Sequence, residues 1–480
     1  MKRLVALLPA AILFFSSFSS ARAIDVKASG TWEIGIGWAD NLNFSDAKQG
    51  EHTDMFSAAQ RIRPQFEFIS SDDLKAVLGM QIFFTWGSPE DGGRLDADEA
   101  TARIRYAYLD WSPIPKAALR MGMQGVALPG AAFGNPVLDT SVAGVVGSYT
   151  FTEKVGLTAF WLRPFDQSYS DGQDAGRNVL DDMDIFGFSL PITGEGFSVT
   201  PWAMYARTGN ASGYWEYRAE YNGNESLGEF FDEYGIKGSS NLWWVGAALE
   251  LDLMSPFALK LDAMYGAAKG GNAPEFSGYL FAGLLEYASE QWWGKPGLIA
   301  WYGSGDDADA YKKGNTNNGD RMGSYGRMPI ISADNAGFAP AGFGFSGSMG
   351  CMQDGLLSQS GVGTWGLGLQ LDGVSFMDKL SHTLRAVYVR GSNDADMIRK
   401  SGRGGRLGRD FAMMGEGVYL TERDYAVEFD FVSAYEVHEN LTLFLETNYV
   451  ILDLDSDVWS GGDSRTTNAW KVQALFEYRF

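Results

Sequence analysis

The last twelve residues of the chain, Ala469 to Phe480, restrict the possible folds more than any other segment. Read in steps of two from the terminus, the apolar positions are Phe480, Tyr478, Phe476, Ala474, Val472 and Trp470. The polar positions between them are Arg479, Glu477, Gln473 and Lys471, and Leu475 interrupts the pattern. Side chains of a β-strand point to opposite faces with a period of two, so this pattern predicts a strand with one apolar face. A strand of about ten residues is long enough to cross a bilayer when it is tilted.

The opposite end of the chain indicates export from the cytoplasm. It contains a basic start at Lys2 and Arg3, an apolar stretch from Leu4 to Phe15, and the sequence Ala21-Arg22-Ala23. A basic start, a short apolar core and a cleavage site with small residues make up a secretory signal peptide. We therefore expect residues 1–23 to be removed as a signal peptide, and residues 24–480 to form one membrane domain.

No segment beyond the expected signal peptide has about 18 consecutive apolar residues, so the sequence predicts no membrane-spanning helix. The other structure that satisfies every backbone polar group in lipid is a closed β-barrel. The 60 glycines and 14% aromatic residues are typical of many strands with tight turns and aromatic girdles. In such a barrel, apolar side chains face lipid and polar side chains face a water-filled lumen. A secreted soluble β-sandwich, with the last segment as an edge strand, is the alternative.

Segments with the same alternation recur along the chain, separated in turn by short turns and long loops. In order they are Val26–Trp38, Arg61–Phe68, Leu74–Trp86, Thr101–Trp111, Ala118–Gln124, Ala143–Thr152, Val155–Arg163, Met183–Leu190, Phe197–Arg207, Leu242–Leu251, Phe257–Ala267, Gly278–Tyr287, Gly297–Gly303, Gly363–Leu371, Leu380–Gly391, Tyr425–Tyr435 and Leu441–Leu452. With the closing segment they predict an all-β transmembrane antiparallel barrel of 16 to 18 strands, with 18 favoured. An even number places both termini on the periplasmic side. The longest loops, from about Ser304 to Gly361 and from Ser392 to about Thr421, contain Cys351 and the basic run Arg403–Arg409 respectively.

Arginines gather on three strands that lie near one another in this order. They are Arg61 and Arg63, then Arg103 and Arg105 on the face opposite Ile104, Tyr106 and Tyr108, and then Arg120. Like charges on one wall repel each other, so the architecture alone gives little reason to collect them. They are therefore candidates for the lining of a pore. The alternative is that they only pair with acids of the lumen such as Glu33 and Glu67.

The segment after the fifth predicted strand, Gly125 to Ser141, neither alternates nor carries much charge. It contains Gly125, Pro129, Phe133, Gly134 and Pro136, and Asp139 is its only acid. These features are expected of a loop that packs inside the barrel.

Together, the signal, the strand rhythm, the aromatic terminus and this loop resemble the trimeric outer-membrane porins, including the branch found in sulfate-reducing bacteria, over the full length. The resemblance implies an inward-folded constriction loop at Gly125–Ser141 that faces an arginine wall of Arg61, Arg63, Arg103, Arg105 and Arg120. It also implies a homotrimer in a Gram-negative outer membrane, in contact with lipid and lipopolysaccharide. General porins carry more than one acid on this loop, whereas here Asp139 stands alone. A wall that attracts anions is therefore an alternative to a strong transverse field.

The function implied is a water-filled channel for the passive diffusion of small hydrophilic solutes and ions, without enzymatic activity or a cofactor. A solute-selective channel for sugars or anions is the alternative, and Trp243 or Trp301 would then face inward as a sugar track. A barrel enzyme is the remote third possibility. Its one adjacent candidate pair, Ser381 and His382, occupies successive positions of a strand, and such positions point to opposite faces.

The remaining composition excludes other classes. A net charge of −22 argues against nucleic acid as a partner. One cysteine and three scattered histidines form neither a disulfide framework nor a metal site.

Overall fold

The computed structural model describes residues 24–42, 44, 55–89, 92–95, 102–166, 182–209, 239–269, 276–289, 293–307, 326–331, 338–345, 357–358, 360–400, 413–414, 417–459 and 465–480. The expected signal peptide, Cys351 and the basic run Arg403–Arg409 lie outside these residues. Among the residues described, no helix is both long enough and apolar enough to cross a membrane.

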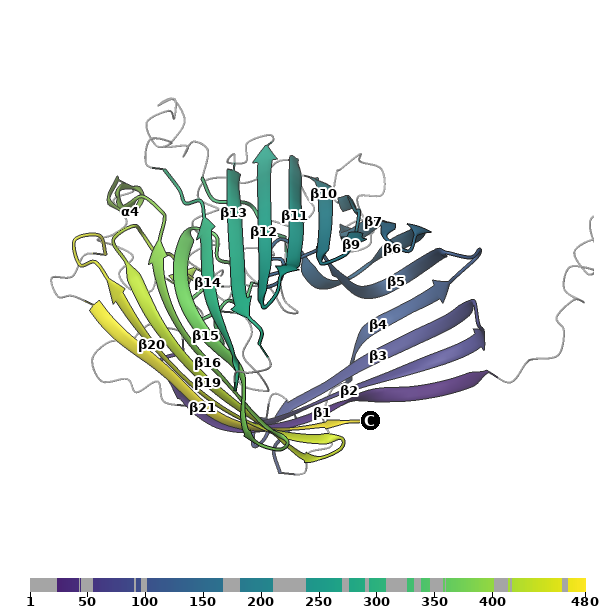
Figure 1. Ribbon diagram of the computed structural model, residues 1–480, viewed down its shortest axis with the longest axis horizontal. Coiled ribbons are helices and arrows are strands. Elements are labelled where there is room, and N and C mark those ends of the chain that lie inside the picture. The colour runs from purple at the N-terminus through teal and green to yellow at the C-terminus, as the bar shows by residue number, and fades with distance from the viewer. Residues whose placement is uncertain are drawn as a thin grey trace, which may run out of the picture.

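The chain forms one large antiparallel sheet that curls into a barrel (Figure 1). Its strands are β1 (Asp25–Asp40), β2 (Met55–Ser71), β3 (Leu74–Thr85), β4 (Ala102–Trp111), β5 (Ala117–Ala127), β6 (Asp139–Thr152), β7 (Val155–Asp166), β8 (Asp182–Ser189), β9 (Ile192–Gly194), β10 (Phe197–Thr208), β11 (Ser240–Met254), β12 (Phe257–Lys269), β13 (Phe276–Tyr287), β14 (Lys295–Gly303), β15 (Thr364–Met377), β16 (Leu380–Gly391), β19 (Tyr425–His438), β20 (Leu441–Leu454) and β21 (Arg465–Arg479). Both β8 and β9 pair with β10, one after the other, so the 19 strands of the sheet make 18 staves. Each of the 18 predicted segments forms one stave, and the favoured strand count is confirmed.

The barrel closes where the first strand meets the last. β1 pairs antiparallel with β21 from Thr31 opposite Arg479 to Asp40 opposite Trp470. Past the end of β21, the Phe480 and Gly30 backbones exchange hydrogen bonds of 2.9 and 3.1 Å. The closing segment therefore has the role that its alternation predicted.

The alternation of the closing strand also has the predicted orientation. Phe476 and Tyr478 lie on the outward face with about 40% of their surface exposed, whereas Lys471 and Gln473 face inward and are buried. Exposed aromatic side chains on the outward face gather toward the strand ends, as in the girdles of membrane barrels. The outside of the barrel is therefore suited to lipid.

The inner face is not polar all the way round, so the expectation that polar side chains face the lumen holds for only part of it. The inward side chains of β10 to β14 are mostly apolar and buried, for example Met204, Trp244, Met264, Leu280 and Trp301. They pack into one core with segments that connect the strands. The alternation of apolar and polar residues along a strand does not predict this core, because the prediction assumed that water fills the whole interior.

β4 contains a bulge that changes which residues share a face. β3 and β4 shift register between Gly79, opposite Tyr106, and Met80, opposite Ile104, so that Arg105 is the extra residue. An extra residue reverses the faces beyond it. Tyr106 and Tyr108 therefore face inward, and the expectation that they lie opposite the arginines is wrong.

The wall is least continuous between β4 and β5, which diverge in Figure 1. Their pairing covers five residues on each strand, from Ala107 opposite Met123 to Trp111 opposite Leu119. Beyond the paired residues of β5, the Gln124 side-chain amide donates to the Gly122 and Gly144 carbonyls at 3.3 and 3.1 Å.

A helix α4 (Ala395–Lys400) and two short strands, β17 (Met413–Met414) and β18 (Gly417–Val418), lie in the connection from β16 to β19.

Candidate functional site

The connection from β5 to β6 is shorter than the predicted loop. Gly125 pairs with Ser141 and Ala127 with Asp139, so Gly125 and Asp139 belong to the strands. Residues 128–138, which we name the first inward segment, remain between the strands and include Pro129, Phe133, Gly134 and Pro136. A turn within the segment depends on Gly134, whose φ of 89° favours glycine.

The first inward segment reaches the opposite side of the barrel, where it meets Asp262 of β12. The Ala131 and Ala132 backbone N–H groups donate to the two carboxylate oxygens of Asp262 at 2.8 and 2.7 Å. Asp262 faces inward and is 3% exposed. Hydrogen bonds to a charged acceptor are stronger than those between neutral groups. Asp262 therefore anchors the segment across the interior.

A second inward segment, residues 326–331 and 338–345, comes from the long connection between β14 and β15. At one end the Trp244 indole donates to the Pro329 carbonyl at 2.7 Å. At the other end the Phe343 and Gly344 N–H groups donate to Glu428 Oε1 of β19 at 2.7 and 2.9 Å. A Cβ on Gly344 would lie 2.6 Å from Glu428 Oε2, so glycine allows this close approach.

The two inward segments also bond to each other. The Ile331 N–H donates to the Val137 carbonyl at 2.9 Å, and the Ala339 N–H donates to the Phe133 carbonyl at 3.0 Å. The Phe133 and Phe338 rings meet edge to face with centroids 5.7 Å apart. The segments therefore form one body inside the barrel, held from β12 and β19.

This body covers one of the two tryptophans proposed for a sugar track. Trp301 faces inward but is buried against Phe338 and Phe345, at ring distances of 5.7 and 5.3 Å. Trp243 lies on the outward face beside Tyr265. Neither indole lines an open path, and this part of the sequence interpretation is wrong.

Replacing Glu428 with alanine is expected to release residues 338–345. The substitution removes two hydrogen bonds to a buried carboxyl oxygen, a loss of about 2 kcal/mol. Chymotrypsin should then cut the detergent-solubilised protein faster after Phe343. Glu428→Gln keeps an acceptor oxygen and should remain close to wild type. Equal cleavage rates for Glu428→Ala and wild type would show that this residue is not the anchor.

The arginine wall (Arg61, Arg63, Arg103, Arg105 and Arg120) lies on β2, β4 and β5. Arg61 bonds to both carboxylate oxygens of Glu33 on β1, the second at 3.0 Å. Arg63 Nε donates to the Gln81 side-chain oxygen at 2.8 Å. Arg103 lies directly opposite Gln81 on the neighbouring strand. Arg63 and Arg103 thus lie beside the same glutamine.

The other two members of the wall lie over tyrosine rings. The Arg105 guanidinium is 4.9 Å from the centre of the Tyr106 ring, and that of Arg120 is 4.3 Å from the centre of the Tyr108 ring. Arg120 also donates two hydrogen bonds to Asp110, at 2.7 and 3.0 Å. Stacking on an aromatic ring holds a guanidinium in place without neutralising its charge. Tyr106 and Tyr108 thus position charges, a role that the sequence interpretation missed.

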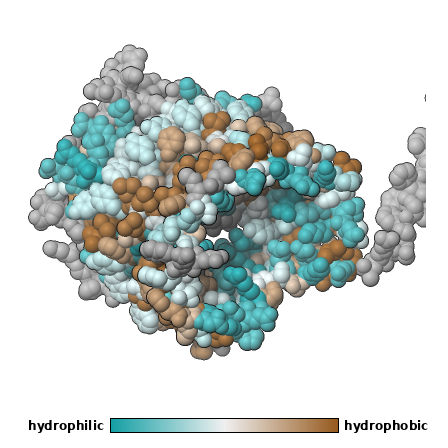
Figure 2. All heavy atoms as spheres, in the orientation of Figure 1, coloured by the Kyte–Doolittle hydropathy of each residue, from teal (hydrophilic) through white to brown (hydrophobic). Residues whose placement is uncertain are grey.

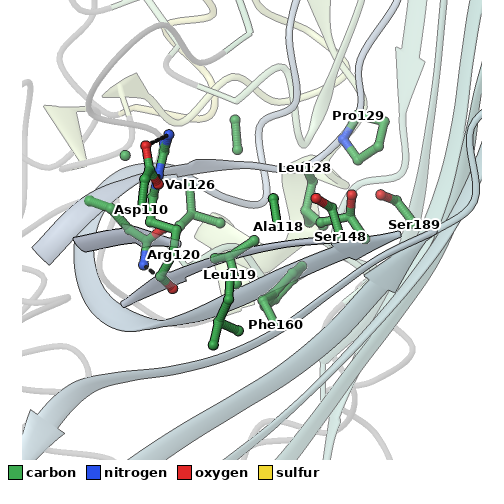
Figure 3. Close-up of a pocket in the computed structure, with 15 residues that line it drawn as sticks. Asp110, Ala118, Leu119, Arg120, Val126, Leu128, Pro129, Ser148, Phe160 and Ser189 are labelled. Carbon is green, nitrogen blue, oxygen red and sulfur yellow. Dashed lines mark hydrogen bonds and ion pairs between the residues drawn. The ribbon is translucent and has the colours of Figure 1, made fainter. Parts of the chain in front are cut away.

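A cavity of ≈ 250 Å³ lies between Arg120 and the start of the first inward segment at Leu128 and Pro129 (Figure 3). Arg120 and Asp110 lie on one side of it, and Ser148 and Ser189 on the other. Figure 2 shows a wider hollow in this face of the molecule, bordered by hydrophilic residues. The interior therefore has a cavity beside Arg120 and Asp110.

The charges are distributed unevenly across the interior. Of the five arginines in the wall, Arg61 is paired with Glu33 and Arg120 with Asp110, whereas Glu67 pairs with Lys75 at 3.2 Å. Arg61 and Arg105 act repulsively on Arg63. Asp262 of β12 and Glu428 of β19 accept hydrogen bonds from backbone N–H groups of the inward segments. Arg63, in contrast to Arg61 and Arg120, therefore bonds to a neutral side chain.

The candidate enzyme pair is separated as expected. Ser381 lies opposite Ala434, and His382 lies opposite Ser433. The His382 Nδ1 atom is 2.8 Å from Ser433 Oγ, and the imidazole stacks on the Phe431 ring at 5.5 Å. Ser433 is only 8% exposed beneath these rings, which blocks a substrate from its hydroxyl.

An 18-stave antiparallel barrel with an apolar exterior defines a membrane-spanning β-barrel. Its fold is similar to that of OccAB3 from Acinetobacter baumannii, with 10% identity and a TM-score of 0.53 over 95% of this chain and 100% of that chain. It is also similar to OccK8 (OprE) and to the outer membrane protein OpdK, both from Pseudomonas aeruginosa, each with 11% identity and a TM-score of 0.51 over 95% of this chain and 98% of theirs. No protein-family model and no curated protein sequence matches the chain.

Proposed function

We propose that this protein is an outer-membrane porin, a water-filled channel for the passive diffusion of small hydrophilic solutes and ions. The observation that carries the proposal is a closed barrel, apolar outside, whose interior keeps a polar, arginine-lined side next to the inward segments. The likeness in fold to the outer membrane protein OpdK supports the location. A solute would cross without covalent chemistry or a cofactor.

The geometry suggests how the channel selects solutes. The two inward segments fill the apolar side of the barrel and leave the arginine wall as the lining of the path. Width and charge at the narrowest point of a pore decide which solutes pass. We assign the narrowest point to the first inward segment, with Pro129, Phe133, Gly134 and Pro136, opposite the wall. Gly125 on β5 and Asp139 on β6 lie on the two strands that this segment connects.

A second candidate function, preference for anionic solutes, is favoured by the charges. Arg63 donates to the neutral side chain of Gln81, whereas the inward acids Asp262 and Glu428 accept hydrogen bonds from backbone N–H groups of the inward segments. Positive charge on a low-dielectric wall raises the local concentration of anions. The channel would then favour anions although the whole chain is acidic.

The test is conductance in planar lipid films with a tenfold KCl gradient. Stepwise current increases are expected on adding the full-length processed protein, and heat-unfolded protein is the control. A reversal potential of the sign for chloride supports the second candidate, and the opposite sign contradicts it. Electrically silent films would contradict the porin itself.

The assembly follows from the resemblance to trimeric porins, including the branch in sulfate-reducing bacteria. We propose that residues 1–23 are removed on export and that the barrel forms a homotrimer surrounded by lipid and lipopolysaccharide. The small residues Ala28, Gly30 and Ala76 on β1 and β3 would supply a close contact between protomers. Native gels in mild detergent, with and without heating, test the trimer. A species that never exceeds the mass of a monomer would contradict it.

A further inference from the structure

Three hydroxyl side chains lie side by side in the cavity at the start of the first inward segment. Ser148 of β6 lies directly opposite Thr158 of β7, and Thr158 lies directly opposite Ser189 of β8. Side chains paired across two strands of a sheet are about 5 Å apart, so the three hydroxyls form a row. We name the cavity, of ≈ 250 Å³, the hydroxyl pocket, and its polar lining is Asp110, Arg120, Ser148, Thr158 and Ser189.

The protein leaves this row without hydrogen bonds of its own. None of the three hydroxyls bonds to another residue in the part of the chain that the structure describes. The hydroxyl of Thr364, which also faces inward, instead donates to the Gly361 carbonyl at 2.7 Å. A hydroxyl group both donates and accepts, so the row offers three two-way hydrogen-bonding groups to a solute in the pocket.

The charged lining of the hydroxyl pocket is neutral in sum. Arg120 and Asp110 are its charged members, and two hydrogen bonds of 2.7 and 3.0 Å join them. The next charged residues around the Tyr108 ring, Lys75 and Glu67, also pair with each other, at 3.2 Å. A solute with a single charge would have to displace a member of a pair, whereas a neutral solute would not.

The ion pair and the hydroxyl row are separated by the length of one small solute. Arg120 lies opposite Val146 on β6, and Ser148 lies two positions further along that strand. Such diagonal neighbours in a sheet are about 7 to 8 Å apart. The two bonds to Asp110 leave Nη1 of Arg120 without a bond to a described residue, and 40% of the Arg120 side chain is exposed. One sugar ring with its hydroxyls can therefore bond to both groups.

An apolar surface lies between these polar groups. Figure 3 shows Phe160 of β7 between Arg120 on one side and Ser148 on the other. Gly187 of β8 lies opposite Phe160, and a Cβ there would overlap the ring. Glycine thus lets the ring lie against the wall and keeps the pocket open. Apolar and aromatic walls with a few placed polar groups are typical of small-molecule sites.

The cover of the hydroxyl pocket is fixed by the first inward segment. The Leu128 N–H donates to the Leu138 carbonyl at 2.9 Å. The Asn135 side-chain amide, which is buried, donates to the Pro129 carbonyl at 2.8 Å. Leu128 and Pro129 both line the cavity. The pocket is therefore formed before a solute arrives, which favours binding because no loop has to be ordered.

We propose that the hydroxyl pocket binds one neutral polyhydroxylated solute, a monosaccharide or a polyol of similar size. The hydroxyl row and the exposed Arg120 nitrogen bond to the solute hydroxyls, and Phe160 contacts the C–H groups of its ring or chain. The solute is thus met by hydroxyls and one phenyl ring, without a tryptophan track. This assignment rests on the proposed channel, which brings solutes to the pocket.

The test is binding of D-glucose and D-mannitol to the full-length processed protein in mild detergent, titrated by saturation-transfer NMR. The triple variant Ser148→Ala, Thr158→Val and Ser189→Ala is expected to weaken binding at least tenfold, because it removes three hydrogen bonds to the solute. The matched control is Ser198→Ala with Thr200→Val, which changes two hydroxyl residues of β10 outside the pocket lining. It should bind like wild type.

A second variant and two competitors make the test specific. Ala118→Leu fills the pocket beside Ser148, its cross-strand neighbour, and should weaken binding while every hydroxyl remains. Acetate should not displace glucose, because it carries a charge. Triethylene glycol dimethyl ether should not displace it either, because it is neutral but has no hydroxyl donor.

Four results would overturn the proposal: no binding of either probe by wild type, equal affinity in wild type and the triple variant, displacement of glucose by acetate, and displacement by the ether. The third would identify an anion site, and the fourth a site that selects by size alone. Conductance in planar films separates the pocket from the channel. Conducting films without glucose binding would contradict the pocket and leave the porin supported. Silent films with glucose binding that requires the three hydroxyls would contradict the porin and leave the pocket supported.

Discussion

Replacing Arg63 and Arg105 with glutamine is expected to reduce the preference for chloride over potassium by about fivefold for each charge removed. One unit charge about 4 Å from an ion in water contributes about 1 kcal/mol, which is the source of this figure. Arg63 bonds to a neutral glutamine and Arg105 stacks on a tyrosine ring, so their charges act on a passing ion. The measurement is the reversal potential in a KCl gradient at low ionic strength.

The control for this experiment is Arg61→Gln, which removes one member of an ion pair with Glu33. It exposes a carboxylate, so it should shift the preference toward potassium without removing the charges of Arg63 and Arg105. Salt provides a second control, because the effect should weaken as the screening length falls to about 3 Å at 1 M salt. An unchanged reversal potential in the Arg63 and Arg105 double variant would show that the wall does not set selectivity.

Replacing Asp262 with alanine is expected to free the first inward segment and to increase conductance. The variant loses two hydrogen bonds to a carboxylate, a weakening of about 3 kcal/mol or more, equivalent to about a hundredfold rise in the released state. Current records should show larger steps and more open-channel noise. Asp262→Asn keeps one acceptor oxygen and should give an intermediate result.

Two further variants make this experiment specific. Glu250→Gln changes another acid of the neighbouring strand β11 that makes no hydrogen bond to the first inward segment, and it should conduct like wild type. Phe133→Ala removes the ring contact with Phe338 but leaves both bonds to Asp262, so it should change conductance less than Asp262→Ala. Wild-type conductance in Asp262→Ala would mean that the contacts with residues 331 and 339 suffice to hold the segment.

The strands of the barrel could largely be predicted from the local alternation of apolar and polar residues. The alternation in β1, β3 and β21 identified each strand and its outward face, because side-chain direction on a strand depends only on position. The pairing of Arg61 with Glu33 was among the predicted alternatives, and the two residues are direct cross-strand neighbours. Glu67, the other acid proposed, bonds to Lys75 instead.

The candidate site was less accessible from sequence. The bulge at Arg105 reverses the faces of β4, and a single irregular residue leaves no mark in an alternating pattern. Asp262 stands 131 residues from Ala131, and nothing in the local sequence links them. Asp262 itself was a signal in the sequence. It lies among the inward apolar positions of β12, and a buried charged residue requires a hydrogen-bond partner.

The amino-acid sequence by itself determined the number of staves, their order and the side of each that meets lipid. These properties follow from period-two alternation and from the rule that backbone groups in a membrane must all be bonded. Only the tertiary structure decided that connections between strands fill part of the interior, and that Asp262 and Glu428 bond to backbone N–H groups there while arginines line β2, β4 and β5. That outcome depends on contacts between residues far apart in the chain, which form only when the barrel brings its opposite walls together.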